Sequence, residues 1–192
     1  MNNRKIHIAI FASGSGTNAA RIIEHFRYHN IICVNLIVCN NPNAKVLEVA
    51  SENNIETLII EKARFFEGDG YVEVLKNKNI EWIILAGFLW KVPLVLITAF
   101  SEKIINIHPA LLPKFGGKGM YGKHVHEAVI AAKESTSGIS IHLVDEIYDH
   151  GRVIFQAKCT VDPTDTPETL AKKIQELEHA YYAEVVENLI TG

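Results

Sequence analysis

The sequence has little of what marks several protein classes. It contains three cysteines, Cys33, Cys39 and Cys159, and no Cys-x-x-Cys pair, so it indicates neither a disulfide framework nor a zinc site. Reduced thiols in a cytoplasmic protein are the simplest interpretation. The formal net charge of −3 provides no bulk attraction to nucleic acid or to an anionic membrane. We therefore predict a cytoplasmic protein whose partners are neither nucleic acid nor membrane.

Long uninterrupted apolar segments are also scarce. Residues 82–100 come closest to a membrane span, but Lys91 and Pro93 interrupt them, and a strand, a loop and a short helix fit better. The apolar residues 6–12 run directly into a glycine-rich turn, which favours a first strand over a signal peptide. The composition is that of a globular protein, with 48% hydrophobic and 21% charged residues. We expect residues 1–192 to form one domain.

Predicted strands and helices alternate along most of the chain. The expected strands are residues 6–12, 34–39, 56–60, 82–86, the start of 103–116, 138–144 and 153–161. The expected helices lie between the glycine-rich turn and about residue 27, and at 43–53, 67–78, 124–133 and 166–189. This alternation predicts an α/β fold with a Rossmann-like, doubly wound, mostly parallel sheet, helices on both faces and an antiparallel C-terminal part. Ligands of such sheets bind beyond the carboxyl ends of the strands.

The glycine-rich turn, residues 13–18, lies between the first strand and the first helix. Backbone N–H groups at a helix N-terminus suit a phosphate. Walker A is excluded because the turn has no lysine. Gly14, Gly16 and Ala19 formally meet the dinucleotide fingerprint, but strand 34–39 ends in Asn-Asn-Pro and not in an acidic residue. A single phosphate is therefore favoured, and the alternative is a tight turn that needs glycine only for its geometry.

Residues 103–116 begin as an apolar strand and end as a proline-rich loop. Asn106 and His108 share one face of an extended segment, and Pro109 biases His108 toward that conformation. An amide N–H can stabilise an oxyanion, and an imidazole can move protons near neutral pH. The alternative interpretation is a His-Pro turn with a hydrogen-bonded asparagine.

Further candidates lie C-terminal to this segment. Asp149 belongs to an Asp-His-Gly turn, and it either only shapes that turn or reaches His108, orienting the imidazole and raising its pKa. His124 and His126 form a pair that could bind a metal, but no third ligand follows at metal-site spacing, so we expect no metal.

The last helix, Thr166 to Leu189, has the clearest signals. Thr166 can cap it, and Pro167 suits its first position. A helical stripe contains Ala171, Ile174, Glu178, Tyr181 and Val185. Glu178 places a charge on this otherwise apolar face, where it is either solvated at the rim or functional.

Four separated motifs occur in one order: residues 13–18, Leu85-Ala-Gly-Phe88, Asn106-Ile-His-Pro-Ala-Leu-Leu-Pro113, and His142 followed by Asp149-His-Gly151. Together they closely resemble the phosphoribosylglycinamide formyltransferase family of folate-dependent enzymes over essentially the full chain. The resemblance implies transfer of a formyl group from 10-formyltetrahydrofolate to the amine of 5′-phosphoribosylglycinamide in de novo purine (IMP) biosynthesis. It implies small-molecule substrates, no metal, and a monomer or homodimer.

The resemblance also implies roles for individual residues. Asn106 and His108 would stabilise the tetrahedral oxyanion and move protons, and Asp149 would orient His108 and raise its pKa. The implied phosphate and ribose contacts are Gly16, Thr17, Asn18, Gln175 and Glu178. The implied folate contacts are Leu89, Trp90, Lys91, Val92, Asn106, Asp145, Glu146, Ile147, Tyr148 and Asp149. Residues 1–100 would form a phosphate-binding half, and residues 101–192 a catalytic and folate-binding half.

The chain departs from the family pattern in places. Trp90 stands where many relatives carry a basic residue, the loop 116–123 is longer than usual, and Arg64 has an uncertain match to a basic folate contact. Methionyl-tRNA formyltransferase adds a C-terminal domain and formyltetrahydrofolate hydrolase an N-terminal one, and we expect neither here. A non-catalytic mononucleotide-binding module would explain the glycine-rich turn but not the Asn, His and Asp set.

Overall fold

The computed structural model describes residues 4–192. In this range one sheet has the strand order β3-β2-β1-β4-β5-β6-β7. Its strands are β1 (Ile6–Ala12), β2 (Ile32–Cys39), β3 (Glu56–Ile59), β4 (Ile80–Leu85), β5 (Ile104–His108), β6 (Thr136–Leu143) and β7 (Val153–Thr160). Strands β1 to β5 pair in parallel, whereas β6 runs antiparallel to both β5 and β7. The predicted sheet, mostly parallel with an antiparallel C-terminal part, is confirmed.

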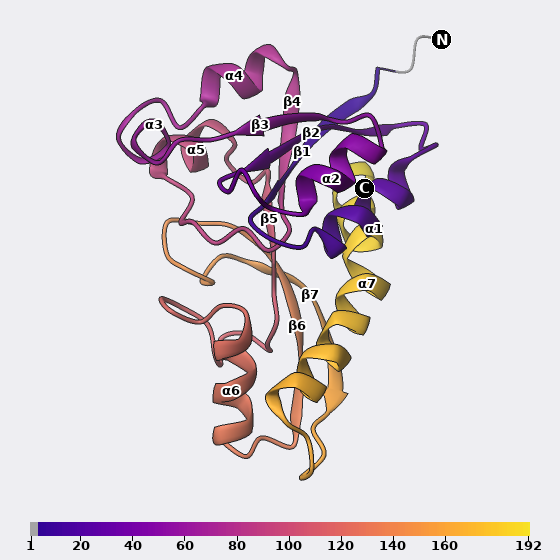
Figure 1. Cartoon of the computed structure of the whole chain (residues 1–192), viewed down its shortest axis with the longest axis vertical. Helices are drawn as coiled ribbons and strands as arrows, with labels where there is room; N and C mark the ends of the chain where they lie inside the picture. Colours follow the sequence, from indigo (N-terminus) through magenta and orange to yellow (C-terminus); the bar gives the residue numbers. More distant parts are fainter. Residues whose placement is uncertain (1–3) are drawn as a thin grey trace.

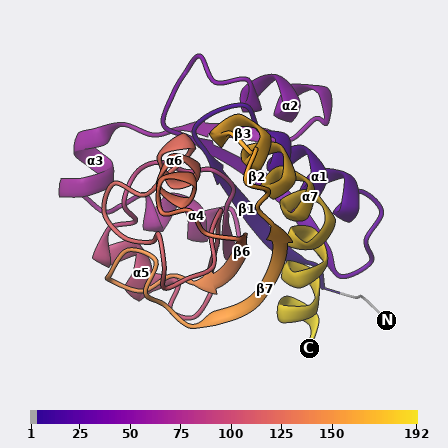
Figure 2. The ribbon, with the colours of Figure 1, turned by 90° about the horizontal axis from the view of Figure 1, so that it is seen from below.

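Helices cover both faces of the sheet (Figure 1). They are α1 (Thr17–Phe26), α2 (Val46–Glu52), α3 (Lys62–Glu67), α4 (Val72–Asn77), α5 (Leu94–Ala99), α6 (Lys123–Ala131) and α7 (Pro167–Thr191). Buried residues of α1, α2 and α7, with Val129 of α6, belong to one hydrophobic cluster, and those of α3, α4 and α5 belong to another. Helix α7 lies alongside α1 (Figure 2).

Strand β1 explains how two clusters can share one sheet. Its residues Ile8 and Ile10 join the cluster under α1 and α7, whereas Ala9 and Phe11 join the cluster under α3 to α5. Successive side chains of a strand point to opposite faces. A strand whose apolar residues alternate between the two clusters is therefore buried on both sides, as expected for the centre of a doubly wound sheet.

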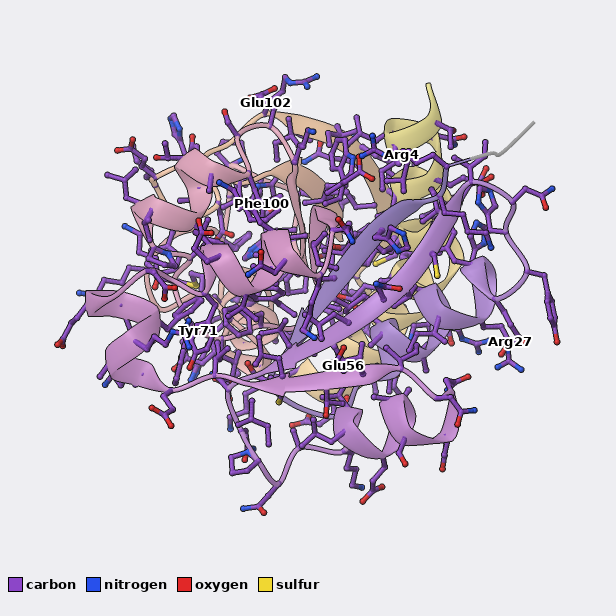
Figure 3. The ribbon with its side chains drawn as sticks, turned by 90° about the horizontal axis from the view of Figure 1, so that it is seen from above. Arg4, Arg27, Glu56, Tyr71, Phe100 and Glu102 are labelled. Carbon is purple, nitrogen blue, oxygen red and sulfur yellow. The ribbon has the colours of Figure 1, made fainter. Side chains whose placement is uncertain are left out.

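One predicted helix, residues 67–78, is wrong in its first part. Helix α3 ends at Glu67, and α4 begins only at Val72. Between them, Gly70 has φ of 57°, and Tyr71, which is labelled in Figure 3, has φ of 63°. This left-handed conformation cannot continue a right-handed helix.

The predicted start of α7 is confirmed, but its buried stripe is only partly correct. The Thr166 side chain caps the helix by accepting from the backbone of Thr169. Tyr181 is 37% exposed, whereas Tyr182 is 1% exposed and belongs to the core. Beyond Glu178, the buried face of the helix therefore lies one residue further along the chain than the predicted stripe.

Arg4, Glu56 and Glu102, labelled in Figure 3, stand at the amino ends of β1, β3 and β5. The carboxyl ends of these strands therefore meet at the opposite edge of the sheet, where ligands of such folds bind. Among the helices of residues 4–192, none combines the length and the apolar character needed to cross a membrane.

Candidate active site

A cleft of about 870 Å³ opens beyond the carboxyl ends of β1, β4 and β5. Its walls come from the turn after β1, the loop after β4, the end of β5, the loop before α6, the loop between β6 and β7, and the middle of α7. The structure thus brings segments from both halves of the chain to one site. It is located where the strand order reverses between β1 and β4, the point at which doubly wound sheets bind ligands.

The turn after β1 is built for close backbone approach. Gly16 has φ of 74°, and an added Cβ would lie 2.8 Å from Val46 Cα, so another residue would clash there. No side chain caps α1, so its first N–H groups have no intrahelical partner, and its first residues line the cleft. The Ser13 hydroxyl accepts from Leu89 N at 2.9 Å, which ties this turn to the loop after β4.

Helix α7 meets this turn through polar side chains. Gln175 Nε2 donates to Thr17 Oγ1 at 3.3 Å, and Asn18 Nδ2 donates to Glu178 Oε2 at 2.8 Å. Burial raises the pKa of Glu178, and the bond from Asn18 partly offsets that rise. Glu178 is therefore not a solvated rim residue. Asn18 Oδ1 is buried without a partner, so an acceptor is available for a ligand hydroxyl or amine.

Tyr182 fixes the position of α7. Its hydroxyl donates to Leu85 O at 2.9 Å and lies 3.3 Å from Ile105 O, which ties the helix to β4 and β5. Glu178 is one turn earlier on the helix and is thereby held toward the cleft. Sequence reasoning missed Tyr182 because the predicted stripe contained its neighbour Tyr181.

Asn106 faces His142 directly across the antiparallel pair of β5 and β6. Asn106 Nδ2 lies 3.0 Å from His142 Nε2, and His142 Nδ1 lies 2.8 Å from Leu143 O. A carbonyl oxygen only accepts, so Nδ1 carries a proton, and Nε2 can then accept from the amide through its lone pair. Asn106 is half-buried and lines the cleft.

His108 is buried at the end of β5. Its Nε2–H donates to Phe115 O at 2.8 Å, and its Nδ1 lies 3.5 Å from Asp149 Oδ2. Burial lowers the pKa of His108, and the opposing effect of Asp149 does not compensate for it. Asp149 thus acts in the predicted direction, but desolvation of the imidazolium is the larger effect, so the net shift of the His108 pKa is downward.

Asp149 bridges the two histidines. Its backbone has φ of 54°, a left-handed conformation that Asp tolerates well, and this turn directs its carboxylate inward. Its Oδ2 accepts from Gly117 N at 2.9 Å, and its Oδ1 lies 3.7 Å from His142 Nε2. Burial raises the pKa of Asp149, but the imidazoles of His142 and His108, when they are protonated, and the Gly117 N–H outweigh burial and lower it overall.

The opposite wall of the cleft is apolar and open. Leu89, Ile147 and Tyr148 line it and remain 56%, 61% and 42% exposed. Lys91 Nζ lies 5.5 Å from the centre of the Tyr148 ring. Trp90 lines the cleft and also packs on the Phe65 and Phe66 side of α3, so the aromatic ring stiffens this loop. Such a wall can accept a flat, partly apolar ligand.

Comparison with known proteins decides the family. The family model described as "Formyl transferase" matches residues 6–186. The chain belongs to the formyl transferase family. It is 41% identical over 189 residues to the chloroplastic phosphoribosylglycinamide formyltransferase of Arabidopsis thaliana, covering 95% of this chain and 65% of that relative. It is 36% identical over 189 residues to phosphoribosylglycinamide formyltransferase of Bacillus subtilis (strain 168), covering 95% and 93% of the two chains.

Solved structures agree with this assignment. The crystal structure of phosphoribosylglycinamide formyltransferase from Bacillus halodurans matches with a TM-score of 0.87 and 36% identity, covering 96% of this chain and 95% of that one. The Geobacillus kaustophilus glycinamide ribonucleotide transformylase 1 matches with a TM-score of 0.87 and 33% identity, covering 97% and 99%. By contrast, the chain spans only 65% and 61% of the length of two plant relatives.

Within this formyl transferase family member, nearly all residues that the sequence assigned to a site line the cleft. The exception is Glu146, which is exposed and does not contribute to the walls. Arg64 also lies outside the cleft. Arg64 donates two hydrogen bonds of 3.0 Å to the Asp69 carboxylate, and its guanidinium lies 4.3 Å from the centre of the Tyr71 ring.

The two histidines at the start of α6 have different surroundings. His126 is buried and lines the cleft, whereas His124 is exposed and lies 3.3 Å from Glu127. In residues 4–192, no three His, Cys, Asp or Glu side chains gather as a metal would require. Sequence reasoning also missed Lys118, Lys123 and Lys172, which line the cleft. The glycine-rich loop 116–123 was the available signal for the first two.

Proposed function

We propose that the chain transfers a formyl group from 10-formyltetrahydrofolate to the amine of 5′-phosphoribosylglycinamide in de novo purine (IMP) biosynthesis. The observation that carries this proposal is the cluster of Asn106, His108 and Asp149 in one cleft, which also contains an uncapped helix N-terminus. The names of the family relatives support the same acceptor.

The acceptor would lie between α1 and α7. Its phosphate would accept from the N–H groups of Gly16, Thr17 and Asn18, where the helix dipole favours an anion. Its ribose hydroxyls would bond to Glu178 and to the unpartnered Asn18 Oδ1, with Gln175 beside them. This arrangement would direct the glycinamide amine toward Asn106.

The formyl donor would occupy the apolar wall. Its flat ring would lie between Leu89–Val92 and the segment 145–149, excluding the exposed Glu146. Asn106 and Asp149 border both ligands, so the formyl carbon and the acceptor amine would meet next to them. Placing two reactants together in this way can contribute several kcal/mol to lowering the barrier.

The chemical step follows from these positions. The amine nitrogen attacks the formyl carbon, and the carbonyl oxygen becomes an oxyanion that the Asn106 N–H stabilises. His108 accepts the amine proton at Nδ1, because Nε2–H is bonded to Phe115 O. The resulting imidazolium is paired with Asp149 and then delivers the proton to the folate nitrogen as the bond from that nitrogen to the formyl carbon breaks. The amide and the imidazolium meet the developing charge, so we assign no role to a metal.

The remaining assignments are proposals of the same kind. Residues 1–100 would supply the phosphate turn, and residues 101–192 the catalytic groups and most of the folate wall, within one domain. We propose small-molecule substrates, a monomer or homodimer, and no nucleic acid or membrane partner. A cytoplasmic location is consistent with the free thiols of all three cysteines.

The test is formyl transfer by the purified protein, with a chelator present, followed by folate absorbance and mass spectrometry of the acceptor. Asn106→Ala and His108→Ala should each reduce turnover by at least ~100-fold with the fold intact. His124→Ala is the matched control, because this exposed imidazole does not line the cleft. Folate consumption without formylated acceptor would indicate a hydrolase, and near-normal turnover in either alanine variant would refute the assigned roles.

A further inference from the structure

Asn106 can serve the proposed reaction only if its amide presents a hydrogen to the oxyanion. The nitrogen and oxygen of a side-chain amide are nearly equivalent in shape, and rotation by half a turn exchanges them. An amide presenting its oxygen would repel the oxyanion. A neighbouring group must therefore select the orientation.

The structure assigns this selection to His142, a positioning residue that acts through Asn106. This inference rests on the proposed formyl transfer and deepens it. The His142 side chain is 2% exposed, and it is opposite Asn106 in the β5–β6 pair. It contacts the amide at 3.0 Å, so the two side chains form a buried cross-strand hydrogen bond.

The orientation is determined by the backbone. Leu143 O accepts from His142 Nδ1–H at 2.8 Å, so this nitrogen holds the ring proton. Nε2 then has a lone pair and accepts only from the nitrogen end of the Asn106 amide. One Nδ2 hydrogen is used in this bond, and the second stays available to the cleft. A proton on Nε2 would instead attract the amide oxygen and reverse the amide.

Asp149 is the competing neighbour. A carboxylate near an imidazole favours a proton on the nearer nitrogen. Its Oδ1 lies 3.7 Å from His142 Nε2, too far for a hydrogen bond. Its Oδ2 is engaged by Gly117 N at 2.9 Å. The bond to Leu143 O is shorter, and it keeps the ring proton on Nδ1 and leaves Nε2 to Asn106.

The tautomer can be tested without turnover. In nitrogen NMR of ¹⁵N-histidine-labelled protein, His142 should show a protonated Nδ1 and an unprotonated Nε2 at neutral pH. The Asn106 amide resonance, identified by its loss in Asn106→Ala, should shift in His142→Asn. A protonated Nε2, or an unchanged amide resonance, would overturn the inference even if the protein proved inactive.

Kinetics test the consequence. In His142→Asn the shorter side chain can still donate to Leu143 O but offers no acceptor to Asn106, and we expect kcat to fall ~10- to 100-fold with little change in KM. His142→Gln places an oxygen near the former Nε2 and should recover most of that loss. In the Asn106→Ala background, His142→Asn should change kcat by less than about twofold, because the effect passes through the amide.

The single and double variants of His142 and Asn106 separate the possible outcomes. Full activity of folded His142→Asn, or an undiminished loss in the Asn106→Ala background, would refute the positioning role. Wild-type protein that transfers no formyl group would refute the proposed function instead, and the NMR result would then decide the inference alone. Thermal unfolding of each variant, monitored by circular dichroism, checks that the fold is intact.

Discussion

Removal of the Tyr182 hydroxyl tests whether this contact holds α7 in register. Tyr182→Phe keeps the ring and its burial but deletes the donor to Leu85 O and the contact to Ile105 O. The site is 1% exposed, so water cannot replace the donor without opening the core. Leu85 is the last residue of β4 and lines the cleft, whereas Ile105 lies near the amino end of β5.

The magnitude follows from the group that is lost. A typical buried hydrogen bond contributes about 1 kcal/mol net, and a buried acceptor left without a donor costs about 1–3 kcal/mol. We therefore expect Tyr182→Phe to lower the free energy of unfolding by about 1–3 kcal/mol. Because Glu178 is one turn away on the same helix, KM for the acceptor should also rise.

Urea denaturation at constant pH measures the first effect, with the m-value as a check that the unfolded state is unchanged. Tyr181→Phe is the matched control. It removes the same atom from the adjacent residue of α7, which is 37% exposed, and should change stability by no more than ~0.5 kcal/mol. Equal effects of the two variants would refute the view that the buried hydroxyl anchors α7.

Other substitutions test the loop, the buried acid and the histidine pair. Ser140→Ala should lower the free energy of unfolding in urea by about 2 kcal/mol, because its buried hydroxyl makes hydrogen bonds with Ala110 O, Leu112 N and the side chain of Gln156. The control is Ser137→Ala, which removes a buried hydroxyl that has no partner and should leave stability unchanged or raise it. Glu178→Gln should stabilise the fold at pH 7, because a carboxyl group with a raised pKa in the folded state makes the protein less stable as pH rises. The stability advantage of the variant should therefore shrink as pH falls toward ~4, and a difference that does not depend on pH would contradict this explanation. Asp149→Asn removes the group that raises the pKa of His108, so NMR titration should find that pKa lower still, and the acid limb of the rate profile should move to lower pH with it.

Much of the fold could be predicted because its elements carry local signals. Strand β1 is apolar at every position except His7, and the Thr166 and Pro167 pair marks the start of α7. The break between α3 and α4 was missed because Tyr71 adopts a left-handed conformation, which only tertiary packing selects in a bulky residue. The burial of Tyr182 and not of Tyr181 was missed because both residues fit a helical period of 3.6 after Ile174. Only the contacts of Tyr182 with β4 and β5 distinguish the two.

The candidate site was predictable in its residues but not in its electrostatics. Asn106 and His108 share a strand face, and the downstream Asp149 completes a recognisable set, so their assembly followed from motif order. The net pKa shift of His108 did not, because it is the balance of burial and one carboxylate, and burial depends on the loop at Phe115. The orientation of the Asn106 amide could not be predicted either, because it depends on the hydrogen bond between His142 and the backbone carbonyl of Leu143.

The lowered pKa of His108 suggests an order of events in the proposed reaction. An imidazole that is neutral before the ligands react is a base, ready to take the amine proton, and not a pre-formed cation. The carboxylate of Asp149 lies 3.5 Å away and stabilises the charge only once it forms, which favours the transition state over the resting state. Asn106, neutral throughout, would supply the first stabilisation of the oxyanion before the imidazolium exists. In the proposed reaction, His142, as the group that orients that amide, would therefore act earlier than Asp149.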